Sequence, residues 1–145
     1  MGKVELPNEI MLGEVTRLLN EGREVVITPK GISMLPFIRG EVDSVRLRKP
    51  AMLVVGDIVL AHFNGQYVLH RIYALDGDRV TLMGDGKLRG IEQVLVTDIV
   101  GIVDDIITPE GRHRKPHKAW LWRHTIGIRK YLLKVYKRWN KLKNR

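Results

Sequence analysis

The stretch Ile58–Ala74 reads IVLAHFNGQYVLHRIYA, and it decides the fold of the chain. Both of its halves are rich in the β-branched and aromatic side chains that favour strands. Between them stands Asn64-Gly65, the dipeptide most typical of a two-residue hairpin turn. The stretch therefore predicts a β-hairpin with one strand over 58–63 and a return strand over 66–74.

Strand signals recur on both sides of this hairpin at short intervals. Asp76-Gly77 follows the return strand and predicts a second hairpin turn. Strands at this spacing, joined by hairpins, are typical of a small antiparallel or mixed barrel rather than of βαβ units. The further segments with a strand pattern are Glu24–Thr28, Val42–Leu47, Arg79–Met83 and Ile91–Val103, the last with a break near Thr97-Asp98.

Helical patterns flank the strands on both sides. Asn8–Asn20 carries apolar side chains at helical spacing, with Asn8 as an N-cap and Gly22 as a C-terminal stop. Ala119–Leu142 carries a second apolar stripe, with lysines and arginines between its members. We therefore expect a mainly β fold, a small barrel with an N-terminal helix and a C-terminal basic amphipathic helix. The expected divisions are residues 1–107 for the β domain, 108–118 for a linker and 119–145 for the basic helix.

Charge divides the chain unevenly. The formal net charge is +9, and residues 112–145 hold 13 of the 25 lysines and arginines with no Asp or Glu. The first 111 residues are therefore mildly acidic, and a signal for an acidic partner belongs to the C-terminal segment alone. The chain has no cysteine, which excludes disulfides and cysteine-based metal sites.

The basic segment, residues 119–145, allows more than one interpretation. A cationic helix with an apolar stripe and aromatic side chains is typical of binding to an anionic membrane surface. Alternatively, the stripe packs on the barrel and the charges are simply solvated. Nucleic-acid binding is not expected, because the segment has no recognised reader motif and no stacking platform.

Neither a membrane span nor a metal site is expected. No uncharged apolar run approaches the roughly 20 residues that a spanning helix needs, and acidic residues interrupt any signal-peptide core near the N-terminus. The expected location is the cytoplasm, with peripheral attachment to a membrane through the basic segment. His113, His117 and His124 suggest a metal only weakly, because Pro116 would break the helix that aligns them. No cofactor is expected.

A second stretch, Gly31–Gly40, reads GISMLPFIRG and carries the candidate nucleophile. Its two glycines and Pro36 indicate a tight, specified loop around Ser33, one of only two serines in the chain. A serine in such a loop can cap the turn by bonding a backbone N–H. It becomes a nucleophile only when a base lies beside it.

Two residues downstream could serve such a serine. Strand alternation puts His70 on the same face as Val68 and Ile72, so it points toward the core if that face is buried. An imidazole there is either a general base or a core histidine bonded to a backbone carbonyl. Asp85, between two glycines, is either the acid that orients the imidazole or part of a plain turn.

These segments resemble the conserved blocks of type I signal peptidases and of the peptidase domain of LexA-type repressors. The histidine and Gly-Asp blocks are closest to the archaeal and endoplasmic-reticulum branch of signal peptidases. The resemblance covers roughly Lys30–Val103, about half of the chain, and its blocks keep the family's order. They are Gly31-Ile32-Ser33-Met34-Leu35-Pro36, Gly56-Asp57-Ile58-Val59, Val68-Leu69-His70-Arg71-Ile72, Met83-Gly84-Asp85-Gly86 and Asp98-Ile99-Val100-Gly101.

The resemblance implies a serine endopeptidase with a signal-peptidase-like barrel, whose catalytic core is about residues 24–104. Ser33 would attack a peptide carbonyl, His70 would be the general base and Asp85 would orient His70. The substrate would be a peptide or protein. The alternative is a non-catalytic module that keeps the same barrel and binds a peptide, a membrane surface or nucleic acid.

The sequence departs from the family in two ways. Many relatives carry a serine two residues before the nucleophile, but this chain has Gly31 there, so backbone N–H groups would have to form the oxyanion hole. Because only about thirty residues precede Ser33 in this sequence, we expect neither the membrane anchor of signal peptidases nor the helix-turn-helix domain of repressors there. A self-cleaving repressor is therefore not expected.

Overall fold

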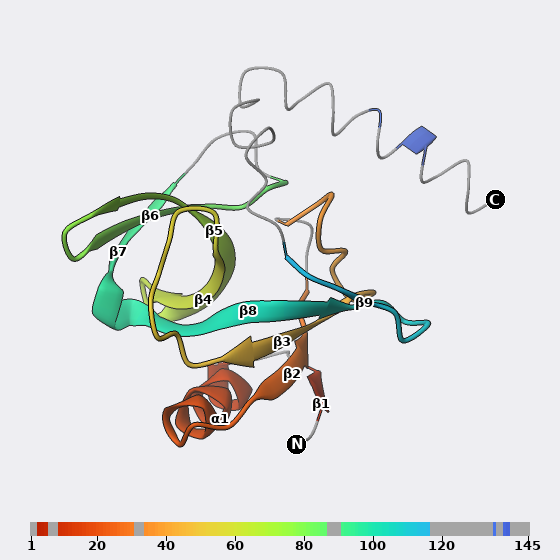
Figure 1. Cartoon of the computed structure of the whole chain (residues 1–145), viewed down its shortest axis with the longest axis horizontal. Coiled ribbons are helices and arrows are strands. Elements are labelled where there is room, and N and C mark those ends of the chain that lie inside the picture. The colour runs from red at the N-terminus through yellow and green to blue at the C-terminus, as the bar shows by residue number, and fades with distance from the viewer. Residues whose placement is uncertain are drawn as a thin grey trace.

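The computed structural model describes residues 3–5, 9–30, 34–86, 91–116, 135 and 138–139. The described chain is mainly β, and its strands form one nine-stranded sheet that curls into a half-barrel (Figure 1). The order of the strands is β1-β2-β3-β8-β4-β5-β6-β7, with β9 beside β8. The elements are β1 (Lys3–Glu5), α1 (Glu9–Asn20), β2 (Val25–Thr28), β3 (Ser44–Arg48), β4 (Ile58–Phe63), β5 (Gln66–Asp76), β6 (Arg79–Met83), β7 (Glu92–Leu95), the 3-10 turn η1 (Val96–Asp98), β8 (Ile99–Ile107) and β9 (His113–Arg114).

The predicted β4–β5 hairpin is confirmed. Asn64 and Gly65 both have positive φ, 51° and 74°, as a two-residue turn between right-twisted strands requires. The strands pair along the whole of β4, from Phe63 opposite Gln66 to Ile58 opposite Arg71. β5 continues two residues beyond the predicted end and pairs with β6 through its second half.

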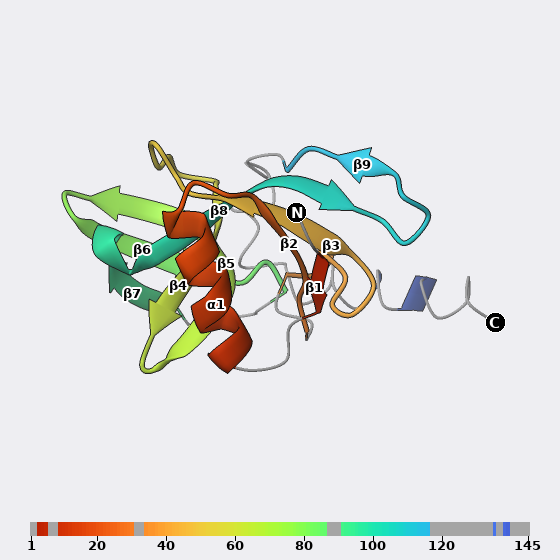
Figure 2. The ribbon, with the colours of Figure 1, turned by 90° about the horizontal axis from the view of Figure 1, so that it is seen from below.

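Residues 58–61 of β4 are buried on both faces of the sheet, because one apolar cluster lies on each side of it. Ile58 and Leu60 of β4 belong to the cluster that also holds side chains of α1, β2, β3 and β8. Val59 and Ala61, which point the opposite way, belong to a cluster with side chains of β6 and β7. Figure 2 shows α1 lying against the sheet, where it contacts β2, β5 and β8.

The ends of the chain differ in part from the predictions. The N-terminal helix is confirmed and begins at Glu9. The predicted linker 108–118 contains the short strand β9, which pairs with β8. The predicted C-terminal helix lies outside the described residues except for Val135, Arg138 and Trp139, which are helical and exposed. None of the helices in the described ranges has both the length and the apolar character needed to cross a membrane.

Candidate active site

His70 lies in the middle of β5, on the face that sequence alternation predicts. Its side chain points to the same face as Val68 and Ile72, which belong to the apolar cluster of β6 and β7. Only 3% of His70 is exposed to solvent. The predicted burial of this imidazole is therefore confirmed.

The contact of His70 that fixes its ring is with Glu92, the first residue of β7. His70 Nδ1 lies 2.5 Å from Glu92 Oε1, and Glu92 is 6% exposed. With the carboxylate accepting a proton from Nδ1, Nε2 is the ring nitrogen that would act as the base. The pair therefore has the arrangement of a general base with an orienting acid.

Strand register explains why Glu92 reaches His70. Ile72 of β5 pairs with Leu82 of β6, and Leu82 pairs with Glu92 of β7. Directly opposed residues point to the same face of a sheet, so Glu92 shares the face of Ile72 and of His70, two residues earlier. Glu92 was not predicted from the sequence: the alternation of Glu92 and Val94 indicates that both face inward, but it does not show that Glu92 reaches His70.

Asp85 binds Arg71, and this differs from the prediction that it orients His70. Both of its oxygens accept from the guanidinium, with Nε–Oδ1 at 2.8 Å and Nη2–Oδ2 at 2.6 Å. Arg71 Nη1 also donates to the carbonyl of Gly56, at 2.8 Å. His70 and Arg71 are consecutive in a strand, so their side chains point to opposite faces. The acid on Nδ1 of His70 is Glu92, and the bidentate partner of Arg71 is Asp85.

Ser33 belongs to residues 31–33, which lie outside the described ranges, so its role stays a prediction. The residues that follow it, Met34–Arg39, form the segment called here the nucleophile turn. Met34 is buried, and its Sδ accepts from the backbone N–H of Asp85 at 3.5 Å. The Phe37 ring lies 5.3 Å from the guanidinium carbon of Arg71, at cation–π distance. The nucleophile turn therefore lies on the Arg71–Asp85 pair, one residue along β5 from His70.

Asp43 closes the nucleophile turn at its other end. Its fully buried carboxylate accepts from the backbone N–H of Arg39 at 2.8 Å and from Nη2 of the same residue at 2.8 Å. A hydrogen bond from the N–H of Glu41 to the carbonyl of Pro29, at 2.7 Å, joins the two ends of the loop that contains Ser33. The loop is thus held on both of its described sides.

The histidines considered for a metal do not form a cluster within the ranges that the structure describes. His113 Nδ1 lies 2.5 Å from Asp105 Oδ2, while His117 and His124 are outside those ranges. No group of three or more metal-ligating side chains occurs among the described residues.

No model of a known protein family matches the chain, and no curated protein matches it at a significant level. The possible chemistry of the site is therefore inferred from the geometry of its described residues. A buried imidazole with one nitrogen bound to a carboxylate can accept a proton from a hydroxyl at the other nitrogen. A tight turn that begins one residue after a serine contacts Arg71, the next residue of the same strand, whose side chain points to the opposite face.

Proposed function

We propose that the chain is a serine endopeptidase with Ser33 as nucleophile, His70 as general base and Glu92 as the acid that orients His70. The observation that carries the proposal is the buried His70–Glu92 pair on β5, the strand whose next residue, Arg71, contacts the nucleophile turn. Burying a carboxylate against an imidazole is costly, and a core needs no such pair for packing alone. The resemblance of the serine, histidine and Gly-Asp segments to signal peptidases points to the same chemistry.

In the proposed mechanism, the Ser33 hydroxyl attacks a peptide carbonyl and gives its proton to Nε2 of His70. Glu92 then faces a positively charged imidazolium and stabilises it. Backbone N–H groups of the loop bind the oxyanion, because position 31 is a glycine without a hydroxyl. The intermediate collapses to an acyl-enzyme on Ser33 as His70 returns the proton to the leaving amine. A water molecule then gives a proton to His70 and attacks the acyl-enzyme. The carboxylic acid product is released, and His70 returns the proton to Ser33.

The pairing of β5 supports an extended peptide as substrate. β4 pairs with Gln66–Arg71, whereas β6 pairs only from Arg71 to Asp76. Among the described strands, residues 66–69 are therefore paired along only one of their two edges. An extended peptide could add to the second edge through main-chain hydrogen bonds, next to His70.

The proposal is tested by acylation with a fluorophosphonate probe, which labels activated serines. We expect a single adduct on Ser33 in the folded protein, absent from Ser33→Ala. Ser44→Ala is the matched control, because Ser44 is buried and bonded to Thr28, and we expect this variant to keep the adduct. His70→Gln should slow labelling about 100-fold or more, since that is the usual contribution of a general base.

Glu92→Gln gives the second arm of this test. The amide cannot stabilise the imidazolium, so labelling should slow about 10-fold or more. Folded wild-type protein without an adduct, or an adduct that survives in Ser33→Ala, would overturn the proposal and favour the non-catalytic module. Mass spectrometry of the labelled peptide identifies the modified residue.

A further inference from the structure

Arg114 of β9 reaches the nucleophile turn from a segment 77 residues away in the chain. Its Nη2 donates to the carbonyl of Phe37 at 2.6 Å. The same nitrogen lies 4.0 Å from Oδ2 of the buried carboxylate of Asp43, which also holds the N–H of Arg39. One guanidinium thus contacts the middle of the turn and the acid that closes it.

The contacts of Phe37 show that the turn is held from two sides. Arg71 lies against the ring of Phe37, and Arg114 binds its carbonyl. Within the turn, the N–H groups of Phe37 and Ile38 both donate to the carbonyl of Met34, at 3.0 Å. Because Met34 follows Ser33 in the sequence, the contacts of Phe37 fix the segment that adjoins the candidate nucleophile.

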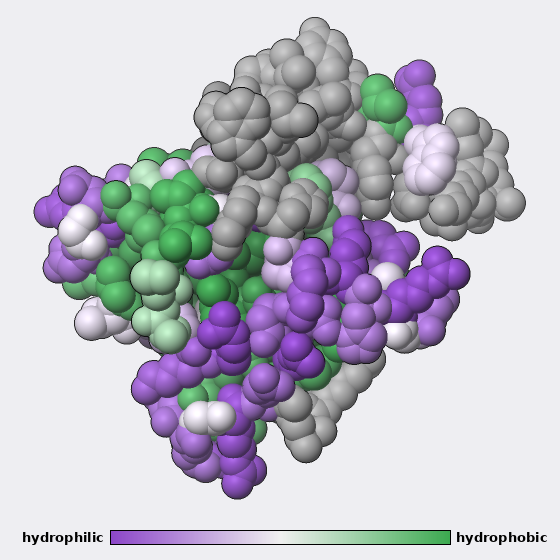
Figure 3. Space-filling model, in the orientation of Figure 1, coloured by the Kyte–Doolittle hydropathy of each residue, from purple (hydrophilic) through white to green (hydrophobic). Residues whose placement is uncertain are grey.

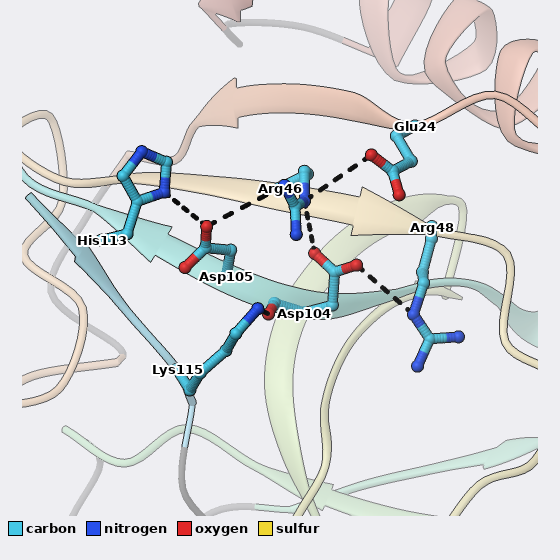
Figure 4. A network of polar contacts seen from close by, with 7 residues as sticks. All are labelled: Glu24, Arg46, Arg48, Asp104, Asp105, His113 and Lys115. Carbon is cyan, nitrogen blue, oxygen red and sulfur yellow. Dashed lines mark hydrogen bonds and ion pairs between the residues drawn. The ribbon is translucent and has the colours of Figure 1, made fainter. Parts of the chain in front are cut away.

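β9 is fixed to the sheet on both sides of Arg114. Ile107 pairs with His113, and His113 binds Asp105 through its ring (Figure 4). Lys115 Nζ donates to the carbonyl of Asp104 at 3.3 Å. A strand of only two residues would not hold by its ladder alone, so these side-chain contacts keep Arg114 at the turn.

We infer that Arg114 is a positioning residue for Ser33, and that β9 belongs to the catalytic unit rather than to a linker. This inference rests on the proposed function for its effect on catalysis. Among the described residues, Arg114 contacts the nucleophile turn and Asp43 rather than His70 or Glu92, and it acts by holding Phe37 and, through Asp43, the backbone of Arg39. The fork of the guanidinium is suited to this task because it can face a carbonyl and a carboxylate at once.

The experiment compares Arg114→Ala, Arg114→Lys and the control Arg112→Ala. Arg112 lies on the same hairpin and is exposed, and its side chain has no partner among the described residues. We expect Arg114→Ala to lower the maximal rate of probe acylation about 10-fold, with little change in the probe concentration at half-maximal rate. Arg114→Lys should recover part of this loss, and Arg112→Ala should match the wild type.

Amide hydrogen exchange of the nucleophile turn is the second measurement, and it does not depend on activity. Exchange at Phe37–Arg39 should become faster in Arg114→Ala than in Arg112→Ala, while amides of β4 keep wild-type protection. Equal exchange in the two variants, or equal acylation of an active protein, would overturn the inference. If the wild type takes no adduct, the proposed function fails, and exchange at the turn alone decides whether Arg114 holds it.

Discussion

Two sets of ion pairs join the strands of this sheet, and they differ chiefly in their exposure to water. In the first, the side chains of Arg71 and Asp85 are 1% and 0% exposed. In the second, the side chains of Arg46 and Asp104 are 28% and 17% exposed. These two residues and those around them in Figure 4 are called here the exposed set. Hydrophilic side chains gather on the side of the molecule where β3, β8 and β9 lie (Figure 3). The chemistry is the same in both sets, but the surroundings give the pairs different roles.

The buried pair is arranged so that its charges are compensated. Asp85 accepts three hydrogen bonds from Arg71, whose remaining nitrogen reaches the carbonyl of Gly56 and whose face meets Phe37. Removing two charges from water costs several kcal/mol each, so such a pair adds little net stability. What it supplies is geometry, because it fixes the nucleophile turn to β5 at Arg71, the residue that follows His70. The exposed set acts on the turn only indirectly, through the contacts of His113 and Lys115 that hold β9 and Arg114.

The largest effect is expected when the buried pair is broken. Asp85→Ala leaves the guanidinium of Arg71 buried without its anion, and the free energy of unfolding should fall by about 3–5 kcal/mol. Urea denaturation followed by circular dichroism measures the loss. The double variant Arg71→Met, Asp85→Leu should be more stable than Asp85→Ala, because it removes both charges. A loss below about 1 kcal/mol in Asp85→Ala would contradict the interpretation of this pair as a coupled unit.

The parts of the fold that were predicted from sequence are those with local signals. Asn64-Gly65 defines the β4–β5 hairpin through its backbone preferences, and periodicity defines α1 and the face of His70. β9 has no such signal, because two residues in a stretch rich in proline and glycine form a strand only when β8 is present to pair with them. Its pairing is a tertiary effect.

The acid that binds His70 could not be assigned from local sequence for a related reason. Glu92 reaches His70 only through the combined registers of two hairpins, β5–β6 and β6–β7. Asp85 was predicted to orient His70 because its segment resembles a signal-peptidase block. Arg71 stands beside His70, however, and a bidentate bond from a guanidinium is stronger than one from a neutral imidazole. The role of Ser33 remains a prediction of the sequence.

A smaller effect is expected in the exposed set. The guanidinium nitrogens of Arg46 lie 2.8 Å from a carboxylate oxygen of Asp104, 3.7 Å from one of Glu24 and 4.0 Å from one of Asp105. The hydrogen bond with Asp104 raises the pKa of Arg46 above its ordinary value, although partial desolvation opposes this shift. Arg46→Gln should lower the free energy of unfolding by only about 1 kcal/mol, because water already solvates these charges. Urea denaturation at about 0.1 M and 1 M NaCl checks this. The effect of Arg46→Gln should shrink in high salt, whereas that of Asp85→Ala should not; equal salt dependence would remove the distinction between the sets.

The smallest effect is a pH dependence carried by Asp105, where burial and neighbouring charges oppose each other. Burial raises the pKa of its carboxyl, but the hydrogen bond and charge of His113, together with Lys115 and Arg46, lower it below the ordinary value of 3.8. Because the folded state then binds fewer protons than the unfolded chain, this carboxylate stabilises the fold above that value. The contribution is lost as the pH falls through the lower pKa of the folded state.

His113→Ala isolates this contribution. Without the imidazole, burial should dominate at Asp105, so the free energy of unfolding should fall less steeply between about pH 5 and pH 3 than in the wild type. Urea denaturation at closely spaced pH values measures the slope. His62→Ala is the control, since His62 is exposed and contacts the ring of Tyr67 rather than a carboxylate. If both variants keep the wild-type slope, the exposed set contributes to acid sensitivity through other carboxylates, and β9 is held by its ladder and by Arg114 rather than by the charge of Asp105.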